Sequence, residues 1–269
     1  RISDSAIDND VKLVAAMGVE MVNGKEITDI EALKKDYDYV VLAVGASEQG
    51  VLKLEAGDTM NALDFLARFK ATEGKVELGK NVVVIGGGNT AMDTARAAKR
   101  NAGVEKVSLV YRRTRRYMPA DEEELVMAVE DGVEFAELLA PVKLENGVLY
   151  CKKMVLGDMD ASGRRGVVET DETVEVPADT VIAAVGEKVP GAFYESFGIA
   201  LDSRRRPQVN QETLETSVKG VYVAGDGLYG PATVVEGIRD GKMAAEAIIG
   251  KALAEDLFKL SDAETIYGR

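Results

Sequence analysis

A glycine-rich turn between two apolar runs constrains the fold of this chain more than any other feature. Residues 82–85 are all β-branched, residues 86–91 read Gly-Gly-Gly-Asn-Thr-Ala, and residues 92–100 have helical spacing before a second apolar run at 107–111. This order predicts a strand, a tight turn, a helix and a second strand, which is the opening of a dinucleotide-binding βαβ unit. A glycine-rich turn that binds no ligand is the alternative interpretation.

The small residues of this turn have distinct roles in such a unit. Gly86 allows the tight turn, Gly88 lets the backbone approach a pyrophosphate, and Ala91 takes the third position, where the helix packs on the strand. Asn89 and Thr90 open the helix, whose free N–H groups and dipole favour phosphate binding. We therefore expect these five residues to bind a dinucleotide cofactor.

The end of the second apolar run indicates which dinucleotide is bound. An NAD site usually carries an acidic residue about 20 positions beyond the glycines, but residues 111–116 read Tyr-Arg-Arg-Thr-Arg-Arg. Guanidinium groups can bind a 2′-phosphate bidentately. We therefore expect Arg112 and Arg113 to bind the 2′-phosphate of NADPH, with Arg116 as a further binding residue. A solvated basic loop is the alternative.

The composition excludes several classes of function. The chain has 269 residues, a net charge of −13, one cysteine and no histidine. The negative charge disfavours nucleic acid and anionic membranes as partners, and no apolar run reaches the roughly 20 residues of a membrane span. Without histidine, the chemistry must come from a cofactor or from carboxylate, Lys, Arg and Tyr groups.

The lone Cys151 excludes an internal disulfide, a CxxC pair and a self-contained iron–sulfur site. It fits a reducing, cytoplasmic setting. We expect a small apolar role for its side chain, buried or at an edge, and no reactivity.

The remaining segments continue the α/β pattern. We expect helices over residues 7–17, 30–35, 58–70, 119–131, 232–249 and 253–260, and strands over residues 19–22, 39–44, 133–138, 179–185 and 221–224. Residues 142–176 alternate in short runs between turn signals, which is typical of an antiparallel meander. The acidic residues 121–124 suit the first turn of a helix; acid catalysis is the alternative for them.

Three of the expected strands end in a glycine. These are Gly45, Gly186 and Gly225, the last followed by Asp226. Ligands bind just outside the carboxyl ends of the strands in open α/β sheets, so these residues are further candidates for cofactor binding. Packing alone is the alternative explanation for each glycine.

Taken together, these motifs resemble the small-subunit family of glutamate synthase, a flavoprotein module also found in dihydropyrimidine dehydrogenase. The resemblance rests on residues 86–93, on residues 110–113 with Met-Pro-Ala at 118–120, and on residues 223–226, and it covers nearly the whole chain. Within that family, residues 111–124 and 137–141 look most similar to the flavoprotein module of the predicted selenate reductase.

The resemblance implies an α/β fold with two dinucleotide-binding, Rossmann-like domains. Residues 47–186 would form an NADPH domain with an antiparallel meander, inserted into an FAD domain made of residues 1–46 and 187–269. Gly225 and Asp226 would meet the ribityl-phosphate region of the flavin. Ala232, Thr233 and Val234 would start the helix that faces the isoalloxazine ring.

The first GxGxxG and the N-terminal cysteine motifs of that family have no match in this chain. We expect them upstream of Arg1 in a longer polypeptide, which makes the FAD domain partial. In the intact protein, NADPH would reduce FAD and the electrons would pass to a further domain or subunit, with an iron–sulfur protein as one candidate.

Three other functions remain open. The first is a non-catalytic NADPH-binding or interaction module that does not retain flavin. The second is a thioredoxin-reductase-like disulfide reductase, which the single cysteine opposes. The third is a flavin-free dehydrogenase, for which no substrate acid or base is evident.

Overall fold

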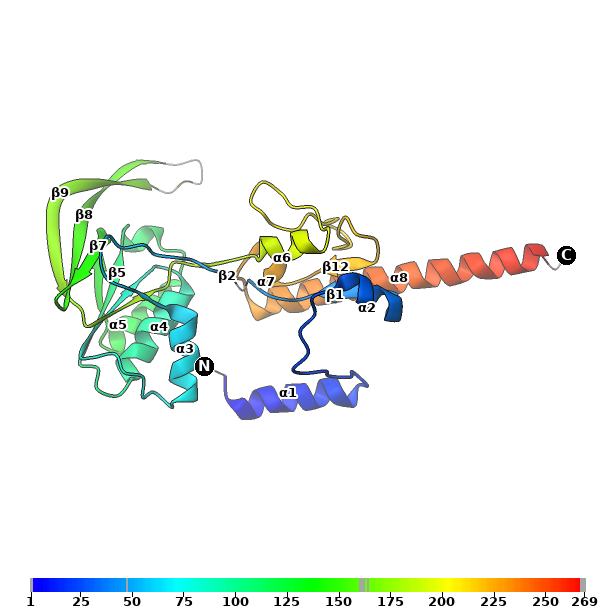
Figure 1. Ribbon diagram of the computed structural model, residues 1–269, viewed down its shortest axis with the longest axis horizontal. Coiled ribbons are helices and arrows are strands. Elements are labelled where there is room, and N and C mark those ends of the chain that lie inside the picture. The colour runs from blue at the N-terminus through cyan, green and yellow to red at the C-terminus, as the bar shows by residue number, and fades with distance from the viewer. Residues whose placement is uncertain (1, 47, 160–162, 164, 267–269) are drawn as a thin grey trace.

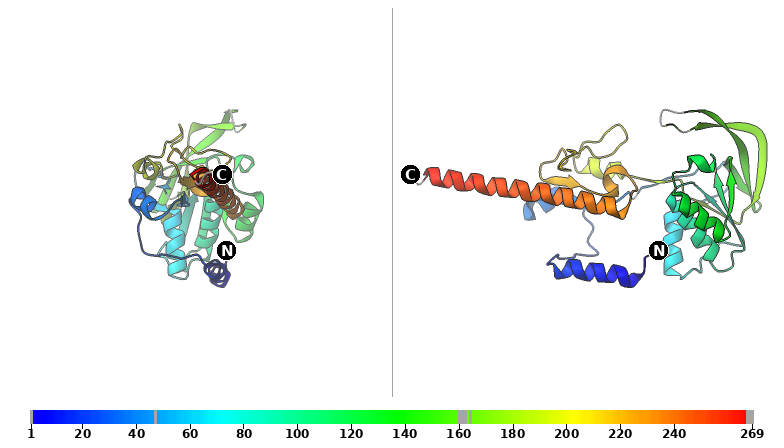
Figure 2. Two further views of the ribbon diagram at one scale, coloured as in Figure 1. Left: turned by 90° about the vertical axis from the view of Figure 1, so that its right-hand side faces the viewer. Right: turned by 180° about the vertical axis from the view of Figure 1, so that it is seen from behind.

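The computed structural model describes residues 2–46, 48–159, 163 and 165–266, with only the backbone for 256–266. Two lobes are joined by two crossing segments (Figure 1). In these segments, β2 (Glu48–Gln49) pairs antiparallel with β11 (Glu187–Lys188). The long helix α8 (Val234–Ile266) extends away from one lobe, and α1 (Asp4–Ala16) lies apart beneath it (Figure 2).

The first lobe is built on a five-stranded parallel sheet in the order β3-β10-β4-β5-β6. Its strands are β3 (Met60–Asn61), β4 (Asn81–Ile85), β5 (Lys106–Tyr111), β6 (Glu134–Glu137) and β10 (Thr180–Ala183). The strand order reverses at β4, because β5 lies on one side and β10 on the other. The crevice at such a reversal, outside the carboxyl ends of the strands, is where open α/β sheets bind ligands.

Both faces of this sheet are covered. One face carries α3 (Ala62–Ala71), α4 (Asn89–Arg100) and α5 (Glu122–Glu130), with Phe65, Met92 and Leu109 buried in the shared core. The other face carries the meander of β7 (Leu139–Glu145), β8 (Val148–Met159) and β9 (Arg165–Pro177). Cys151 is buried in that second core, as expected.

The second lobe has a smaller sheet. Its two parallel strands are β1 (Val40–Leu42) and β12 (Val221–Val223). Around them lie α2 (Ile30–Asp36), α6 (Gly191–Ser196), α7 (Asp226–Tyr229) and the first half of α8. The expected α/β class is confirmed, whereas the domain boundaries at 46/47 and 186/187 stay a prediction.

Several expected elements differ from the structure. No strand forms at residues 19–22, where Val19, Met21 and Val22 are exposed. The strand expected at 39–44 to be buried on both faces is shorter, and Val41 and Val44 are 43% and 40% exposed, because one strand pair cannot cover both faces. Residues 187–220, for which the sequence predicts no helix, contain α6.

The helix ends also differ. The helix expected from residue 58 begins at Ala62 and is capped by Asn61, whose side chain accepts the N–H groups of Leu63 and Asp64. The helix expected from residue 119 begins at Glu122, after the short 3₁₀ turn η1 (Arg115–Tyr117). The two helices expected at 232–249 and 253–260 are one helix, α8, because Gly250 does not interrupt it.

Asp179 ties the start of β4 to the segment before β10. Its Oδ2 accepts hydrogen bonds from the N–H groups of Lys80 (2.9 Å) and Asn81 (2.8 Å), and from the Asn81 side-chain amide (3.2 Å). The Asn81 N–H is the largest of several contributions that hold the pKa of Asp179 below its ordinary value of 3.8.

We expect Asp179→Ala to lower the free energy of unfolding near neutral pH by about 1 kcal/mol, because exposed N–H groups lose their acceptor. A carboxylate with a depressed folded-state pKa stabilises the fold above its unfolded-state pKa, and this stabilisation is lost as the pH falls through the folded-state pKa. Urea unfolding over a falling pH series should therefore show the difference shrinking below about 3.8. Asp171→Ala, an exposed aspartate, is the control; a pH-independent loss would contradict the assignment.

Candidate functional site

The glycine turn leaves the sheet at the carboxyl end of β4. A Cβ on Gly86 would lie 2.3 Å from the Ala184 carbonyl oxygen, and one on Gly87 would lie 2.4 Å from the Tyr111 ring. A Cβ on Gly88 would meet nothing closer than Pro119, at 4.0 Å. Gly86 and Gly87 are thus required by packing, while Gly88 faces open space, as a phosphate-binding position must.

The start of α4 offers unused donors to that space. Within the described chain, the backbone N–H groups of Gly87, Gly88, Asn89 and Thr90 donate no hydrogen bond, whereas those of Ala91 and Met92 donate to Gly88 O. Free N–H groups at a helix N-terminus attract anions through their partial charge and the helix dipole. These residues fit the pyrophosphate of a dinucleotide, and the completely buried Ala91 fits the packing position.

A second loop is fixed against the glycine turn. Asn89 donates its side-chain amide to Asp121 Oδ2 (3.1 Å) and accepts the Asp121 N–H (3.0 Å). The Ala120 N–H donates to Gly87 O (3.0 Å), and the Tyr111 hydroxyl donates to Tyr117 O (2.8 Å). Asn89 therefore holds the start of α5, and only its backbone N–H is free for a ligand. Asp121 is the N-cap residue of α5, and no sequence pattern indicates that it pairs with Asn89.

The arginines beyond β5 fall into two groups. Arg115 pairs with Glu122 (2.8 Å), and Arg116 lies over the Tyr117 ring, 5.9 Å from its centroid. Arg113 donates from Nε to the Arg165 carbonyl (3.1 Å), and neither it nor Arg112 forms an ion pair among the described residues. Arg112 and Arg113 thus lack the carboxylate partners that would neutralise them, and the alternative of a solvated basic loop stays open.

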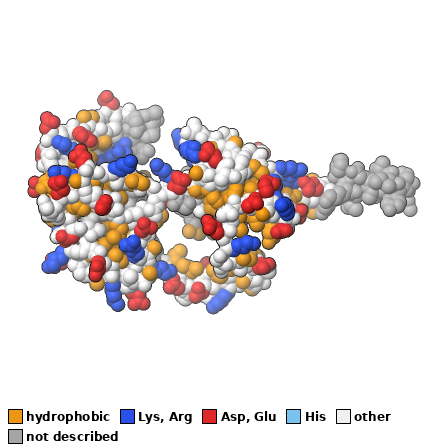
Figure 3. Space-filling model, viewed as in Figure 1, with side chains coloured by type: hydrophobic (Ala, Val, Ile, Leu, Met, Phe, Trp, Pro, Cys, Tyr) orange, Lys and Arg blue, Asp and Glu red, His pale blue; other side chains and the backbone are white. Residues whose placement is uncertain are grey.

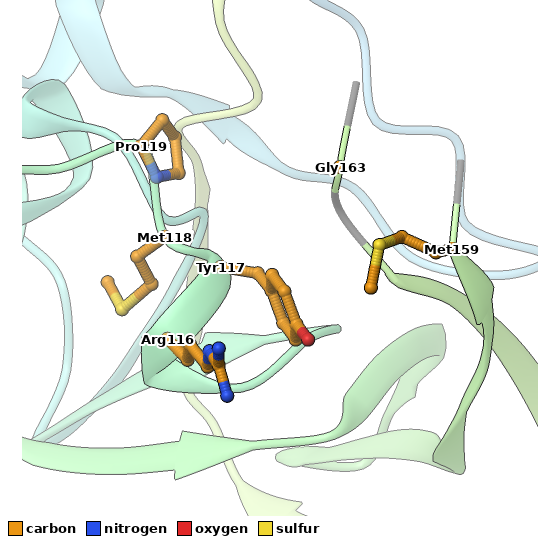
Figure 4. Close-up of a pocket in the computed structure, with 6 residues that line it drawn as sticks. All are labelled: Arg116, Tyr117, Met118, Pro119, Met159 and Gly163. Carbon is orange, nitrogen blue, oxygen red and sulfur yellow. The ribbon is translucent and has the colours of Figure 1, made fainter. Parts of the chain in front are cut away.

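A pocket of about 480 Å³ lies beside this loop. It is lined by Arg116, Tyr117, Met118, Pro119, Met159 and Gly163. Tyr117 projects into it from one side and Met159 from the other (Figure 4). Met159 comes from the end of β8 and had no signal in the sequence, because the meander was expected only as a supporting element.

The glycines of the second lobe also lie at strand ends. β1 and β12 run in parallel with Leu42 opposite Val223, so Gly45 and Gly225 leave the same edge. Both have φ of +70°, and a Cβ on either would have no neighbour closer than 3.9 Å. Gly186 is likewise open, and it lies in the crossing segment, where its carbonyl accepts the Gly50 N–H (2.7 Å).

The segment after Gly225 is shaped by its own hydrogen bonds. Asp226 Oδ1 accepts the Ala232 N–H (3.1 Å). Thr233 and Glu236 form a capping box at the start of α8, in which the Thr233 N–H lowers the pKa of Glu236. Val234 is 72% exposed. A free second carboxylate oxygen on Asp226 and an open apolar helix start fit the sugar and ring of a flavin.

The structure does not bring the two sets of candidates into contact. No hydrogen bond or ion pair of the described residues joins the 86–91 turn to residues 225–234. Hydrophobic side chains show on the surface of the second lobe (Figure 3). On α8, the side chains of Val234, Val235 and Ile238 are exposed.

Two buried side chains have a raised pKa and stay protonated. Burial raises the pKa of the Cys151 thiol to about 12, so it stays protonated and unreactive. Burial also raises the pKa of Tyr194 to about 12, and its hydroxyl, packed beneath Gly227, finds no hydrogen-bond partner in the described part of the chain. Among described residues, no cluster of His, Cys, Asp or Glu could hold a metal ion, and no helix is long and apolar enough to cross a membrane.

The chain belongs to the pyridine nucleotide-disulphide oxidoreductase family, whose model matches residues 4–241. Its single buried cysteine means that the described chain carries no redox disulfide of its own.

Relatives of known name agree with this family. YgfK of Escherichia coli K12, provisionally named an oxidoreductase, is 40% identical over 93% of this chain and 25% of its own length. The beta subunit of NADP(+)-dependent formate dehydrogenase of Moorella thermoacetica is 35% identical over 92% and 37%. The glutamate synthase [NADPH] small chain of Azospirillum brasilense is 34% identical over 95% and 58%. The expected resemblance to glutamate synthase small subunits is confirmed, and the chain spans only part of these relatives.

Solved structures share the fold. FprA of Mycobacterium tuberculosis in complex with NADPH superposes with a TM-score of 0.65 over 86% of this chain and 68% of that one, at 20% identity. Thioredoxin reductase of T. acidophilum gives 0.56 over 80% and 66%, at 21% identity.

Substitutions in the glycine turn should separate folding from ligand binding. We expect Gly88→Ala to keep the thermal midpoint of the parent chain, since its φ of −97° suits alanine and its Cβ meets open space. The methyl group would obstruct a phosphate, so NADPH affinity should fall by roughly tenfold or more in a calorimetric titration. Gly86→Ala is the contrast and should lose roughly 2–4 kcal/mol of stability by its clash. Unaltered NADPH affinity in Gly88→Ala would show that the nucleotide lies elsewhere.

Proposed function

We propose that this chain is the NADPH-binding part, with a portion of the flavin-binding part, of an oxidoreductase that passes electrons from NADPH through FAD to a further domain or subunit. The observation that carries the proposal is the free-amide turn at Gly87–Thr90 together with Arg112 and Arg113, which form no ion pair with any described carboxylate. A pyrophosphate suits the first and a 2′-phosphate suits the second.

The residues of the proposed NADPH site have separate roles. Gly86, Gly88 and Ala91 shape the turn, the amides at the start of α4 orient the pyrophosphate, and Arg112, Arg113 and Arg116 select the phosphorylated ribose. The bound nicotinamide and flavin supply the hydride chemistry, so the chain itself needs to position them and exclude water.

For FAD we assign a narrower set. Gly45, Gly186 and Gly225 leave room for close approach of the cofactor, and Asp226 accepts a sugar hydroxyl. Ala232, Thr233 and Val234 place the start of α8 against the ring, where the helix dipole favours a negatively charged reduced flavin. The relatives named as beta subunits or small chains support an electron-accepting partner, with iron–sulfur proteins as candidates, and the lone thiol fits a cytoplasmic location.

The arginine assignment has a direct test. In Arg112→Ala plus Arg113→Ala, the ratio of NADPH to NADH affinity should fall by roughly a hundredfold, because two charged hydrogen bonds are lost. Arg115→Ala is the matched control, since Glu122 already neutralises Arg115. Calorimetry with both coenzymes measures the ratio. If the double variant keeps the parental ratio, Arg112 and Arg113 do not bind the 2′-phosphate.

The flavin assignment is tested by absorbance. The purified chain, mixed with FAD and desalted, should keep a flavin spectrum that NADPH bleaches under anaerobic conditions, and Asp226→Ala should weaken FAD retention. NADPH binding without retained or bleached flavin would favour the rival function, a non-catalytic NADPH-binding module. The exposed apolar start of α8 is the observation that favours this non-catalytic function.

A further inference from the structure

The strands β8 and β9 continue beyond their neighbour β7. β7 pairs only with residues 148–153 of β8, whereas residues 155–159 pair only with residues 165–168 of β9. We call these two stretches the arm. Met159 and Arg165 face each other across the arm as its last described pair. This free extension needs an explanation, because neither core requires it.

The arm meets the basic loop beyond β5. Arg113 donates from Nε to the carbonyl of Arg165 (3.1 Å), across 52 positions of sequence. Arg165 in turn donates from Nε to the carbonyl of Gly157 (2.8 Å), so its side chain is held along the arm. The Arg113 guanidinium is therefore held against the backbone of Arg165, and the Arg165 guanidinium against the backbone of the arm, in both cases by a carbonyl oxygen and not by a carboxylate.

The charges at this junction are uncompensated. Arg112, Arg113 and Arg165 form no ion pair with a carboxylate within the part of the chain that the structure describes. This occurs in a chain with a net charge of −13, where carboxylates are plentiful. Neighbouring like charges repel, so such a cluster is stabilised when an anion lies among its free Nη groups.

The pocket beside this cluster has a different character. Met159 of the arm faces Tyr117 and Pro119 across about 480 Å³ (Figure 4). Apolar and aromatic walls of this kind suit the flat face of a purine base, and the volume is in the range of small-ligand sites. The arginine cluster can bind a doubly charged phosphate, and the apolar pocket next to it can bind a base. Together they match a phosphorylated adenosine.

We propose that the arm forms one side of the site that binds the adenosine of NADPH. Arg165 binds the 2′-phosphate together with Arg112 and Arg113. Met159 packs on the adenine opposite Tyr117. This inference rests on the proposed NADPH function. It adds two residues from the meander to a site otherwise built from the βαβ unit: Arg165, which determines specificity for the 2′-phosphate, and Met159, which contacts the adenine of either coenzyme.

Calorimetric titration of the full chain with NADPH and NADH tests the role of Arg165. Arg165→Gln should weaken NADPH binding by about tenfold and NADH binding by less than about twofold, since only NADPH carries the 2′-phosphate. Arg165→Lys should restore part of the NADPH preference because it keeps the charge. Arg204→Gln, which removes an exposed arginine from the second lobe, is the control and should change neither affinity.

Met159→Ser tests the adenine contact. It should weaken NADPH and NADH by the same factor, several-fold, because both carry adenine. Met17→Ser removes a methionine that is 78% exposed just after α1 and is the matched control. The exposed positions of Met159 and Arg165 mean that these variants should unfold at the parental midpoint.

The outcomes separate the two proposals. If Arg165→Gln keeps the parental NADPH/NADH ratio while Arg112→Ala plus Arg113→Ala lowers it, the arm is not part of the adenosine site and the proposed function stands. If neither variant changes the NADPH/NADH affinity ratio, the assignment of the 2′-phosphate site is wrong, and both proposals are wrong with it. Unchanged binding of both coenzymes to Met159→Ser overturns the adenine contact.

Discussion

The close backbone contact at Gly86 is the constraint on which the first lobe depends. β4 and β10 pair in parallel, and the Ala184 N–H donates to Ile85 O (2.8 Å), so the two chains leave the sheet together. A side chain on Gly86 would overlap the Ala184 carbonyl. Only glycine lets β4 turn at once into α4 here, and this turn places the free amides of α4 at the point where the strand order reverses.

The loop beyond β5 depends on the same turn. Tyr111 packs on Gly87, and its hydroxyl holds the carbonyl of Tyr117, while Asn89 holds Asp121. The chain between these anchors carries Arg112 to Arg116 past the glycine turn. Among the residues that the structure describes, the Glu122 carboxylate neutralises Arg115 and none pairs with Arg112 or Arg113, so the fold concentrates positive charge at one edge of an acidic protein.

The second lobe is organised differently. Its two-stranded sheet leaves Val41 half-exposed, and α1 has no buried residue and is tied to α3 by an exposed ion pair between Asp4 and Lys70. Such a pair contributes little stability. The buried Asp240, which accepts the Gly225 N–H (3.2 Å), nevertheless fixes the end of β12 where that glycine lies. The lobe thus has ordered strand ends within an incompletely covered sheet.

The sequence by itself determined the βαβ unit, the meander and the α/β class, because β-branched runs, helical spacing and Gly86–Ala91 are local signals. It did not determine that residues 19–22 lack a partner strand, that Gly250 continues α8, or that Asn61 caps α3, since each depends on neighbours distant in the chain. The tertiary structure alone decided that Asn89 pairs with Asp121 and that Arg165 meets Arg113. Arg113 and Arg165 lie 52 positions apart and share no local sequence pattern. Only the register of β8 on β9 brings them to one edge.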